Sequence, residues 1–312
     1  MILEAQNISL SFGRPILKAI SLKLKEGEII SIVGRSGAGK TSLLKILAGL
    51  LTPDTGSVLF DGERIKGPNE RLIPGHDEIC LVNQDFSLDD FHTVEENIRL
   101  QILHLKLKVR DRYTDELISL MGLEDVRKQQ ARSLSGGEQQ RLAIARVLAK
   151  EPRVILLDEP FSHLDSDLRT RLTSYLLELR RVRGTSFVLV SHDGAEVLGL
   201  SDSIFFMKNG VLTKKGDPKK VYYRYGTLQE ARLFGPVNSV KIGNERILFR
   251  PDEYTLLEVA GAPKLKLQFI EVSFTGPVYE NYFLTENQEK IVLFSFTSLE
   301  EINVVYIAKK TS

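Results

Sequence analysis

The sequence predicts a parallel α/β domain followed by a smaller, strand-rich domain, and three observations support this fold class. Residues 28–33 form a short apolar run that leads into a glycine-rich turn, and residues 41–51 then carry apolar side chains at helical spacing. Three further apolar runs end in polar residues, as buried parallel strands do where a sheet opens onto a site: 79–82, 154–157 and 186–190. Ten of the 24 Phe and Tyr residues lie after residue 235, which marks the second domain.

Length and composition agree with this organisation. The chain has 312 residues, enough for about two domains with sizeable cores. Hydrophobic residues make up 42% and charged residues 27%, which argues against a disordered, collagenous or membrane-embedded chain. The net charge is +1, so no overall field favours nucleic acid or an anionic membrane, and any phosphate binding must be local.

The cysteine count and the distribution of apolar residues bear on location. Cys80 is the single cysteine, so there is no internal disulfide, and its apolar surroundings favour a buried thiol in a reducing compartment. No stretch approaches the 18 or so uninterrupted apolar residues of a membrane span, and the N-terminus lacks a basic segment followed by an apolar one. We therefore expect another subunit to bring this chain to any membrane at which it works.

The remaining elements follow in order along the chain. Residues 56–62 alternate and end in Asp-Gly, which predicts a hairpin in a small antiparallel layer. Helical patterns then dominate a proposed insertion at about 85–150, in the segments 94–105, 112–121 and 139–150. Turn residues separate five strand-like runs in the tail, the pattern of a small β-barrel: 237–242, 264–274, 279–285, 290–296 and 304–307. We expect one domain over 1–235 and a second over 236–312.

The glycine-rich turn matches GxxxxGK[ST] between a strand and a helix, the context that this motif requires. Its backbone N–H groups and the helix N-terminus favour phosphate, Lys40 reaches the β- and γ-phosphates, and the Thr41 hydroxyl can ligate Mg²⁺. The candidate ATP-binding residues of this turn and of the helix start after it are Gly34, Arg35, Ser36, Gly37, Ala38, Gly39, Lys40, Thr41 and Ser42.

Two further motifs carry chemistry. Asp158 and Glu159 end an apolar strand, where the first carboxylate is placed to hold Mg²⁺ and the second to polarise an attacking water. A second anion site, with a hydroxyl and glycine N–H groups before a helix, is predicted at Leu134, Ser135, Gly136, Gly137 and Glu138. One chain thus carries two half-sites.

These motifs resemble those of the ATP-binding-cassette (ABC) ATPases, because they occur in that family's order over residues 1–235. In this resemblance Phe12 is similar to the aromatic residue that stacks on adenine, Gln84 to the Q-loop glutamine, and His192 to the switch histidine. The remaining motifs resemble Walker A (34–41), the signature (134–138), Walker B (154–158) with Glu159 as the catalytic glutamate, and the D-loop (162–165), which ends in Asp165. The resemblance implies the P-loop NTPase fold.

The resemblance also implies a head-to-tail homodimer in which Walker A of one copy and the signature of the other hold the same ATP. Gln84 would contact the γ-phosphate and Mg²⁺, together with the metal ligands Thr41 and Asp158, and His192 would bond the γ-phosphate and the attacking water. Two residues depart from the family pattern. Glu138 stands where glutamine is commoner, and His163 is unusual in the D-loop and is given no role.

The tail has a weaker resemblance of its own. Residues 249–253 resemble the Arg-Pro-Glu element that opens the C-terminal OB-like (TOBE) domain of importer ATPases, and 264–308 are similar to its barrel. OB-like barrels also bind single-stranded nucleic acid. The tail has 8 basic and 10 acidic residues, which disfavours that function, so no nucleic-acid partner is expected.

From the resemblance we expect the ATPase subunit of an ABC importer, peripheral to the cytoplasmic face of the inner membrane, with ATP and Mg²⁺ as cofactors. Its partners would be a second copy, integral-membrane permease subunits and, indirectly, an extracytoplasmic solute-binding protein. The alternatives are a soluble non-transport ABC ATPase and an exporter motor, which the TOBE-like tail disfavours. The solute is selected by the partners, so iron(III), inorganic anions and polyamines all stay open.

Overall fold

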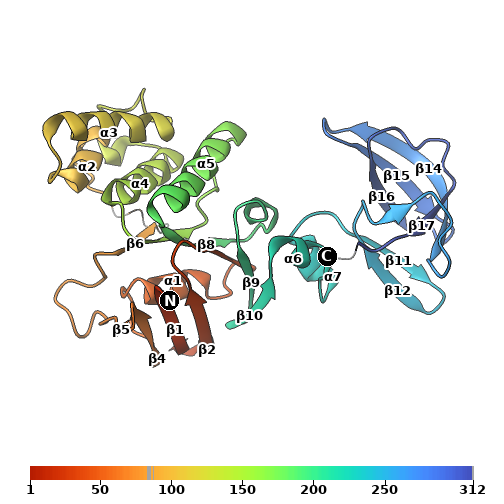
Figure 1. Ribbon diagram of the computed structural model, residues 1–312, viewed down its shortest axis with the longest axis horizontal. Helices are drawn as coiled ribbons and strands as arrows, with labels where there is room; N and C mark the ends of the chain where they lie inside the picture. The colour runs from red at the N-terminus through yellow and green to blue at the C-terminus, as the bar shows by residue number, and fades with distance from the viewer. Residues whose placement is uncertain (83–85, 87, 311–312) are drawn as a thin grey trace. The chain divides into compact units, whose positions relative to one another are not determined.

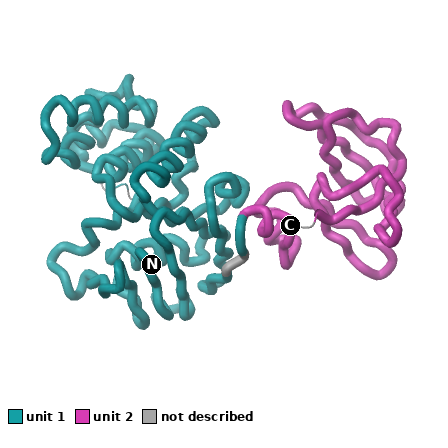
Figure 2. Tube along the Cα trace, viewed as in Figure 1, with its two compact units in different colours: residues 1–217 teal, residues 218–312 magenta. Residues whose placement is uncertain are grey.

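The computed structural model describes residues 1–82, 86 and 88–310. The chain divides into two compact units, residues 1–217 and residues 218–312 (Figure 2). The composition change near residue 235 lies within the second unit, 17 residues after its start at Pro218. Among the described residues no helix is both long and apolar enough to cross a membrane.

A six-stranded sheet organises the first unit, with strand order β10-β9-β3-β8-β7-β6. The five strands from β9 to β6 run parallel, and β10 is antiparallel to β9. Their bounds are β3 Ile29–Val33, β6 Ile79–Val82, β7 Val154–Asp158, β8 Ser186–Ser191, β9 Ser203–Lys208 and β10 Val211–Gly216. The predicted parallel core is confirmed.

Both faces of this sheet are buried, which explains why its strands are continuous apolar runs. On β7, Ile155 and Leu157 pack into one hydrophobic cluster with the helices α2 to α5, whereas Val154 and Leu156 pack into a second cluster. The second cluster also contains α1 and the antiparallel sheet, on the opposite side in Figure 1. The helices of this unit are α1 Lys40–Leu47, α2 Val94–Arg99, η1 Leu100–Ile102, α3 Leu107–Leu120, η2 Ala131–Ser133, α4 Gly136–Lys150, α5 Ser166–Arg183 and η3 Ala195–Val197.

A four-stranded antiparallel sheet of order β2-β1-β4-β5 completes the first unit and contains the predicted hairpin. Its strands are β1 Leu3–Phe12, β2 Arg14–Leu24, β4 Thr55–Phe60 and β5 Glu63–Arg64. The turn between β4 and β5 places Asp61 at φ 49° and Gly62 at φ 85°, the left-handed values that an Asp-Gly hairpin turn requires.

The second unit begins with two short helices and continues as antiparallel strands. They form a two-stranded sheet, β11-β12, and a five-stranded sheet of order β13-β17-β14-β15-β16. The bounds are α6 Pro218–Tyr223, α7 Leu228–Arg232, β11 Asn238–Ile242, β12 Glu245–Phe249, β13 Tyr254–Thr255, β14 Lys264–Phe274, β15 Tyr279–Thr285, β16 Lys290–Ser295 and β17 Val304–Ile307. The two end strands meet through side-chain and loop bonds, since Phe294 N donates to Pro251 O and Tyr254 Oη donates to Phe294 O, both at 3.0 Å. The sheet therefore curls on itself around one apolar core.

Arg250 explains why residues 218–235 belong to the second unit. It is fully buried, and its guanidinium donates to the carbonyl oxygens of Tyr222 at 2.8 Å, Gly235 at 3.0 Å and Pro236 at 2.9 Å. The same guanidinium lies 4.1 Å from the centre of the Tyr222 ring, a cation–π contact. One side chain thus holds the segment carrying α6 and α7 to the strands.

Candidate functional site

The carboxyl ends of the parallel strands bring the predicted site residues together. Val33 at the end of β3 pairs with Ser191 at the end of β8, and Asp158 at the end of β7 pairs with Val190. Gly34 N then donates to Ser191 O at 3.3 Å, so the glycine-rich loop starts beside the end of β8. Since ligands of open α/β sheets bind at this edge, the arrangement forms a candidate site.

Two glycines of the loop are required by close packing. A Cβ on Gly34 would lie 2.3 Å from Met207 O, a distance that real Cβ atoms do not reach. Gly39 has φ 102°, and its Cβ would lie 2.8 Å from the side chain of Leu17 on β2. The loop therefore passes directly over β9 and β2 before α1 begins.

Lys40 is buried inside the loop that it ends. Its Nζ donates to Gly34 O at 2.7 Å and to Arg35 O at 3.2 Å, and the residue is 6% exposed. Burial lowers the pKa of the ammonium, and the charges of Glu159 and Asp158 act in the opposite direction. The ammonium thus has the loop's own carbonyl oxygens as partners, which a phosphate could replace.

The other predicted loop residues lie at the surface or in the first turn of α1. Arg35, Ser36 and Gly37 are exposed, Ala38 is buried, and Ser42 is half-buried. Phe12 ends β1 and is 62% exposed, opposite Arg14 at the start of β2. An exposed aromatic ring of this kind is available to a flat ligand.

Thr41 and Asp158 are brought together although they are 117 residues apart. Thr41 Oγ1 donates to Asp158 Oδ2 at 2.6 Å. Asp158 is 4% exposed, and this burial raises the pKa of its carboxyl, while the bond from Thr41 lowers it. A hydroxyl and a desolvated carboxylate are oxygen ligands of the kind that Mg²⁺ prefers. The residues present fit that ion.

Glu159 and His192 form a second pair beside the first. His192 Nδ1 lies 3.2 Å from Glu159 Oε2, and the Glu159 backbone N–H donates to Val190 O at 2.9 Å. Glu159 has φ 52°, a left-handed conformation that is costly for a side chain of this type. This turn directs the chain away from β7 immediately after Asp158.

The predicted second anion site is an exposed helix start. Ser135 is the N-cap of α4, and it forms a capping box with Glu138: Ser135 N and Oγ each donate to Glu138 Oε2 at 2.7 Å, and Glu138 N donates to Ser135 Oγ at 3.4 Å. The bond from the Ser135 hydroxyl lowers the pKa of the Glu138 carboxyl. Glutamate and glutamine both make this box, which explains why Glu138 serves at this position. Leu134 anchors the turn as a buried residue.

Gln140 is a polar link that the sequence did not single out. It is 4% exposed, and its Nε2 donates to Glu159 O at 3.0 Å and to Ser162 Oγ at 3.1 Å. The helix that carries the signature is thereby bonded to the turn that carries Glu159. The sequence signal for this role is a glutamine that stands one turn into an amphipathic helix.

The D-loop residue Asp165 is the N-cap of α5, where its Oδ1 accepts from Leu168 N at 2.8 Å. Helix capping is therefore sufficient to explain why a carboxylate stands at this position. Gln84 lies outside the described residues, so its proposed contacts stay a prediction.

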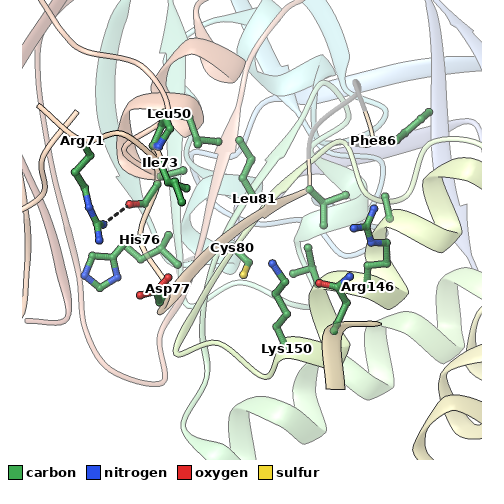
Figure 3. A pocket seen from close by; sticks show the side chains of 18 residues that line it. Leu50, Arg71, Ile73, His76, Asp77, Cys80, Leu81, Phe86, Arg146 and Lys150 are labelled. Atoms are coloured by element: carbon green, nitrogen blue, oxygen red, sulfur yellow. Dashed lines mark hydrogen bonds between the residues drawn. The ribbon is translucent and has the colours of Figure 1, made fainter. Parts of the chain in front are cut away.

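A cavity of about 640 Å³ lies between β6 and α4, on the flank of the sheet (Figure 3). Its lining includes Leu50, Ile73, Cys80, Phe86 and Lys150, from segments on both sides. Burial raises the pKa of the Cys80 thiol, as expected for an unreactive cysteine.

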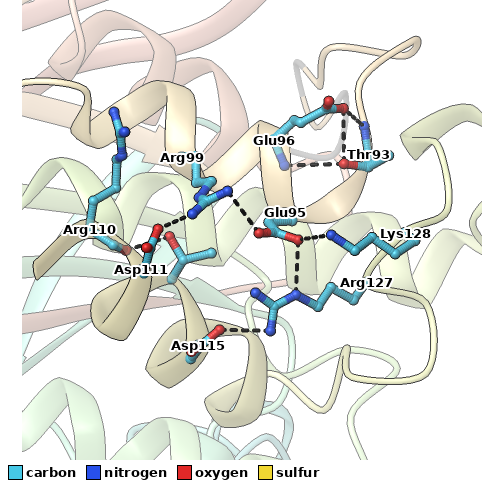
Figure 4. Close-up of polar contacts among 10 residues, drawn as sticks. Thr93, Glu95, Glu96, Arg99, Arg110, Asp111, Asp115, Arg127 and Lys128 are labelled. Carbon is cyan, nitrogen blue, oxygen red and sulfur yellow. Dashed lines mark hydrogen bonds and ion pairs between the residues drawn. The ribbon is translucent and has the colours of Figure 1, made fainter. Parts of the chain in front are cut away.

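A cluster of charged residues centred on Glu95 stabilises the packing of α2 against α3 (Figure 4). Glu95 is 5% exposed, and its carboxylate pairs with Arg99 at 3.0 Å, Arg127 at 3.0 Å and Lys128 at 2.5 Å. The bond from Arg127, first, and then the bond from Lys128 lower the pKa of Glu95 to about 2, although burial acts in the opposite direction. Arg99 also pairs with Asp111, and Arg127 with Asp115 at 2.7 Å, so the Glu95 cluster ties α2 to α3 and to the segment before the signature.

Comparison with known proteins places these features in a family. A family model described as "ABC transporter" matches residues 17–162. The chain is 36% identical over 307 residues to the spermidine/putrescine import ATP-binding protein PotA of Bacillus cereus, covering 96% of this chain and 92% of that protein. It is 35% identical over 295 residues to PotA of Thermotoga maritima, covering 93% and 77% of the two chains.

Solved structures match about two thirds to three quarters of the chain. A dimeric post-hydrolysis ATP-binding cassette bound to ADP and Pi is 29% identical with a TM-score of 0.60, covering 68% of this chain and 98% of that one. The cbiO1 protein of Clostridium perfringens, part of the ABC transporter complex cbiONQ, is 28% identical with a TM-score of 0.58, covering 72% and 91%.

Proposed function

Because this chain belongs to the ATP-binding subunits of ABC transporters, we propose that it hydrolyses ATP to drive the import of a polyamine such as spermidine or putrescine. The observation that carries the proposal is the similarity to PotA over 96% of the chain, which extends through the second unit and well beyond the cassette. If the chain were a soluble non-transport ATPase or an exporter motor, similarity to an importer subunit over that length would have no explanation.

The glycine-rich loop is the proposed phosphate site. Lys40 would exchange its bonds to the carbonyl oxygens of Gly34 and Arg35 for the β- and γ-phosphates, whose charge compensates the burial that disfavours its ammonium. The exposed ring of Phe12 would stack on the base. Arg35, Ser36 and Gly37 offer exposed backbone to the phosphates.

Thr41 and Asp158 are two proposed Mg²⁺ ligands, and Gln84 is the third. Thr41 Oγ1 and Asp158 Oδ2 already lie 2.6 Å apart. Burial raises the pKa of the Asp158 carboxyl, because the surrounding protein does not fully compensate its negative charge. The ion, when bound, supplies the charge that offsets the phosphate oxygens.

Glu159 is the proposed general base for the attacking water, and His192 orients it. The 3.2 Å contact between the two side chains places a proton donor and acceptor side by side at the end of the sheet. Gln140 on α4 and Ser162 on the loop after β7 both donate to Glu159 O, so the backbone that carries the carboxylate has a defined position.

The signature residues Ser135, Gly136 and Gly137 are the proposed contact for nucleotide held by a second copy. Ser135 and Gly136 are exposed and Gly137 is half-buried at the start of a 15-residue helix, which supports this role because a helix N-terminus with free N–H groups attracts phosphate. The homodimer is therefore part of the proposal, and Asp165 belongs to the loop that would face the partner.

The proposed contact with a membrane permease lies around the cavity beside α4. Several large apolar side chains are exposed on the segment that borders it: Phe91, Leu100, Leu103, Leu107 and Val109. Exposed apolar groups at this density favour a protein partner. Attachment to permease subunits would keep the chain at the membrane, with a solute-binding protein outside.

The test is uptake of labelled spermidine by cells that carry this chain together with the permease and binding-protein genes found beside its own. The unaltered chain is expected to restore uptake, and Lys40→Ala is expected to abolish it. Lys18→Ala, which removes an exposed lysine from β2, is the matched control and should leave uptake unchanged. Restored uptake of sulfate or iron(III) without spermidine would refute the polyamine assignment, while keeping the ATPase assignment.

A further inference from the structure

His192 follows the last residue of β8, on a turn held by side chains that the proposed mechanism does not use. The His192 side chain is 55% exposed, and its Nδ1 lies 3.2 Å from Glu159 Oε2. Packing does little to fix a ring that is exposed to this extent. The position of the imidazole beside Glu159 therefore depends on how firmly the backbone of the turn is held.

Ser191 holds the backbone on both sides of His192. It is 1% exposed, and its Oγ accepts from Asp193 N at 2.9 Å. Its carbonyl oxygen accepts from Gly34 N at 3.3 Å, at the start of the glycine-rich loop. A serine hydroxyl rotates and has one hydrogen to donate. The group that accepts this hydrogen therefore sets the direction of the lone pair that Asp193 uses.

Glu196 on η3 is the group that accepts this hydrogen. Ser191 Oγ donates to Glu196 Oε2 at 2.9 Å. The other oxygen, Glu196 Oε1, pairs with Arg169 Nη2 on α5 at 3.2 Å, and the Glu196 side chain is 13% exposed. The carboxylate is thus held between the end of β8 and α5, and a hydrogen bond to a charged acceptor is stronger than one between neutral groups.

We propose that Glu196 is a positioning residue for ATP hydrolysis, which fixes the turn of His192 through the Ser191 hydroxyl and so holds the imidazole beside Glu159. This inference rests on the proposed function, in which Glu159 is the base and His192 orients it. Arg169 has a supporting part, because its charge keeps the Glu196 carboxylate in the place from which it accepts the bond of Ser191.

The experiment measures kcat for ATP hydrolysis, and the ATP concentration that gives half of the maximal rate, on the full chain with Mg²⁺. Glu196→Ala is expected to lower kcat by about tenfold to 10²-fold, since a displacement of about 1 Å at a catalytic group costs up to about 10²-fold. The half-saturating concentration should change less than about twofold, because the glycine-rich loop keeps its own contacts with nucleotide.

Double variants separate positioning of the imidazole from general support of the fold. In a chain that already carries His192→Ala, adding Glu196→Ala should change kcat less than about twofold, because the imidazole on which Glu196 acts is gone. Ser191→Ala should lower kcat about as much as Glu196→Ala does. The two together should lose little more than either alone, because both remove the same bond.

A conservative variant tests the bond itself. Glu196→Gln keeps the shape of the side chain and an oxygen that can accept from Ser191 Oγ, so it should retain most of the kcat that Glu196→Ala loses. A kcat as low as that of Glu196→Ala would contradict the role of this bond. Glu178→Ala, which removes an exposed glutamate from α5, is the matched control and should hydrolyse ATP as the unaltered chain does.

Other results would also overturn the inference. An unchanged kcat in Glu196→Ala, together with a loss in His192→Ala, would show that the turn keeps its position without this carboxylate, and would leave the proposed function intact. A further tenfold loss on adding Glu196→Ala to His192→Ala would show that Glu196 supports the fold and does not act through the imidazole. An unchanged kcat in His192→Ala would refute the proposed role of His192, and the role of Glu196 with it.

Discussion

Glu95→Gln should destabilise the first unit in a manner that depends on pH. The substitution keeps the shape of the side chain and removes the negative charge that pairs with Arg99, Arg127 and Lys128. Glu95 is 5% exposed, so its carboxylate depends on these cations more than on water. Removing it leaves three positive charges close together around a neutral amide.

The pKa of Glu95 sets the magnitude. It falls from 4.5 to about 2, which corresponds to about 3 kcal/mol of unfolding free energy by linkage. Because the folded-state pKa is the lower one, this contribution is complete above the unfolded value of 4.5. It is then lost as the pH falls towards about 2, with about half remaining near pH 3.3. Solvent around Lys128, whose side chain is 79% exposed, reduces the expected loss at pH 7 to about 2 to 3 kcal/mol.

The assay is urea unfolding of the unaltered chain and Glu95→Gln at pH 7, 5 and 3.5, followed by far-UV circular dichroism. Glu70→Gln is the control, because Glu70 pairs with Arg64 in an exposed position and its removal should matter much less. Equal unfolding free energies at pH 7, or a difference that does not shrink between pH 5 and 3.5, would refute the assignment of Glu95 as the centre of this cluster.

Four further outcomes are expected. Lys40→Ala should weaken ATP binding at least about tenfold, or about 1.4 kcal/mol, and a titration giving unchanged affinity would remove the phosphate role of the loop. Glu159→Gln keeps ATP affinity but should slow hydrolysis by about 10²-fold or more and accumulate the ATP-bound dimer; near-normal turnover would transfer the role of base to His192. A chain that ends at Asp217 should bind ATP as the full chain does but associate more weakly in sedimentation. A chain that ends at Gly235 should in addition be prone to aggregation, because α6 and α7 lose Arg250, and equal solubility of the two would contradict the role of that arginine.

Local features of the fold could be predicted from the sequence because they depend on neighbouring residues. The glycine-rich loop is such a case, since Gly39, Lys40 and the following helix act within one turn of each other. The buried strands were likewise visible as apolar runs, and the ranges predicted for β14, β15 and β17 agree with the structure. Apolar burial on both faces makes a strand continuous in hydrophobicity, whatever its neighbours are.

The composition change near residue 235 did not reveal the extent of the second unit. That extent depends on Arg250, whose bonds reach back to Tyr222 and Gly235 along the chain. A single buried arginine leaves no mark on composition, so composition alone places the segment with α6 and α7 in the first domain.

Which short segments form the loop, the strands and the helix starts follows from neighbouring residues along the chain. Which of these segments meet depends on the fold, because strand order sets contacts between residues far apart in the chain. Thr41 reaches Asp158, Glu159 lies beside His192, and Gln140 bonds the Glu159 turn only when β3, β8 and β7 lie side by side. The Glu95 cluster has the same origin: its cations come from separate segments, and hydrophobic packing of the helices brings them to one carboxylate.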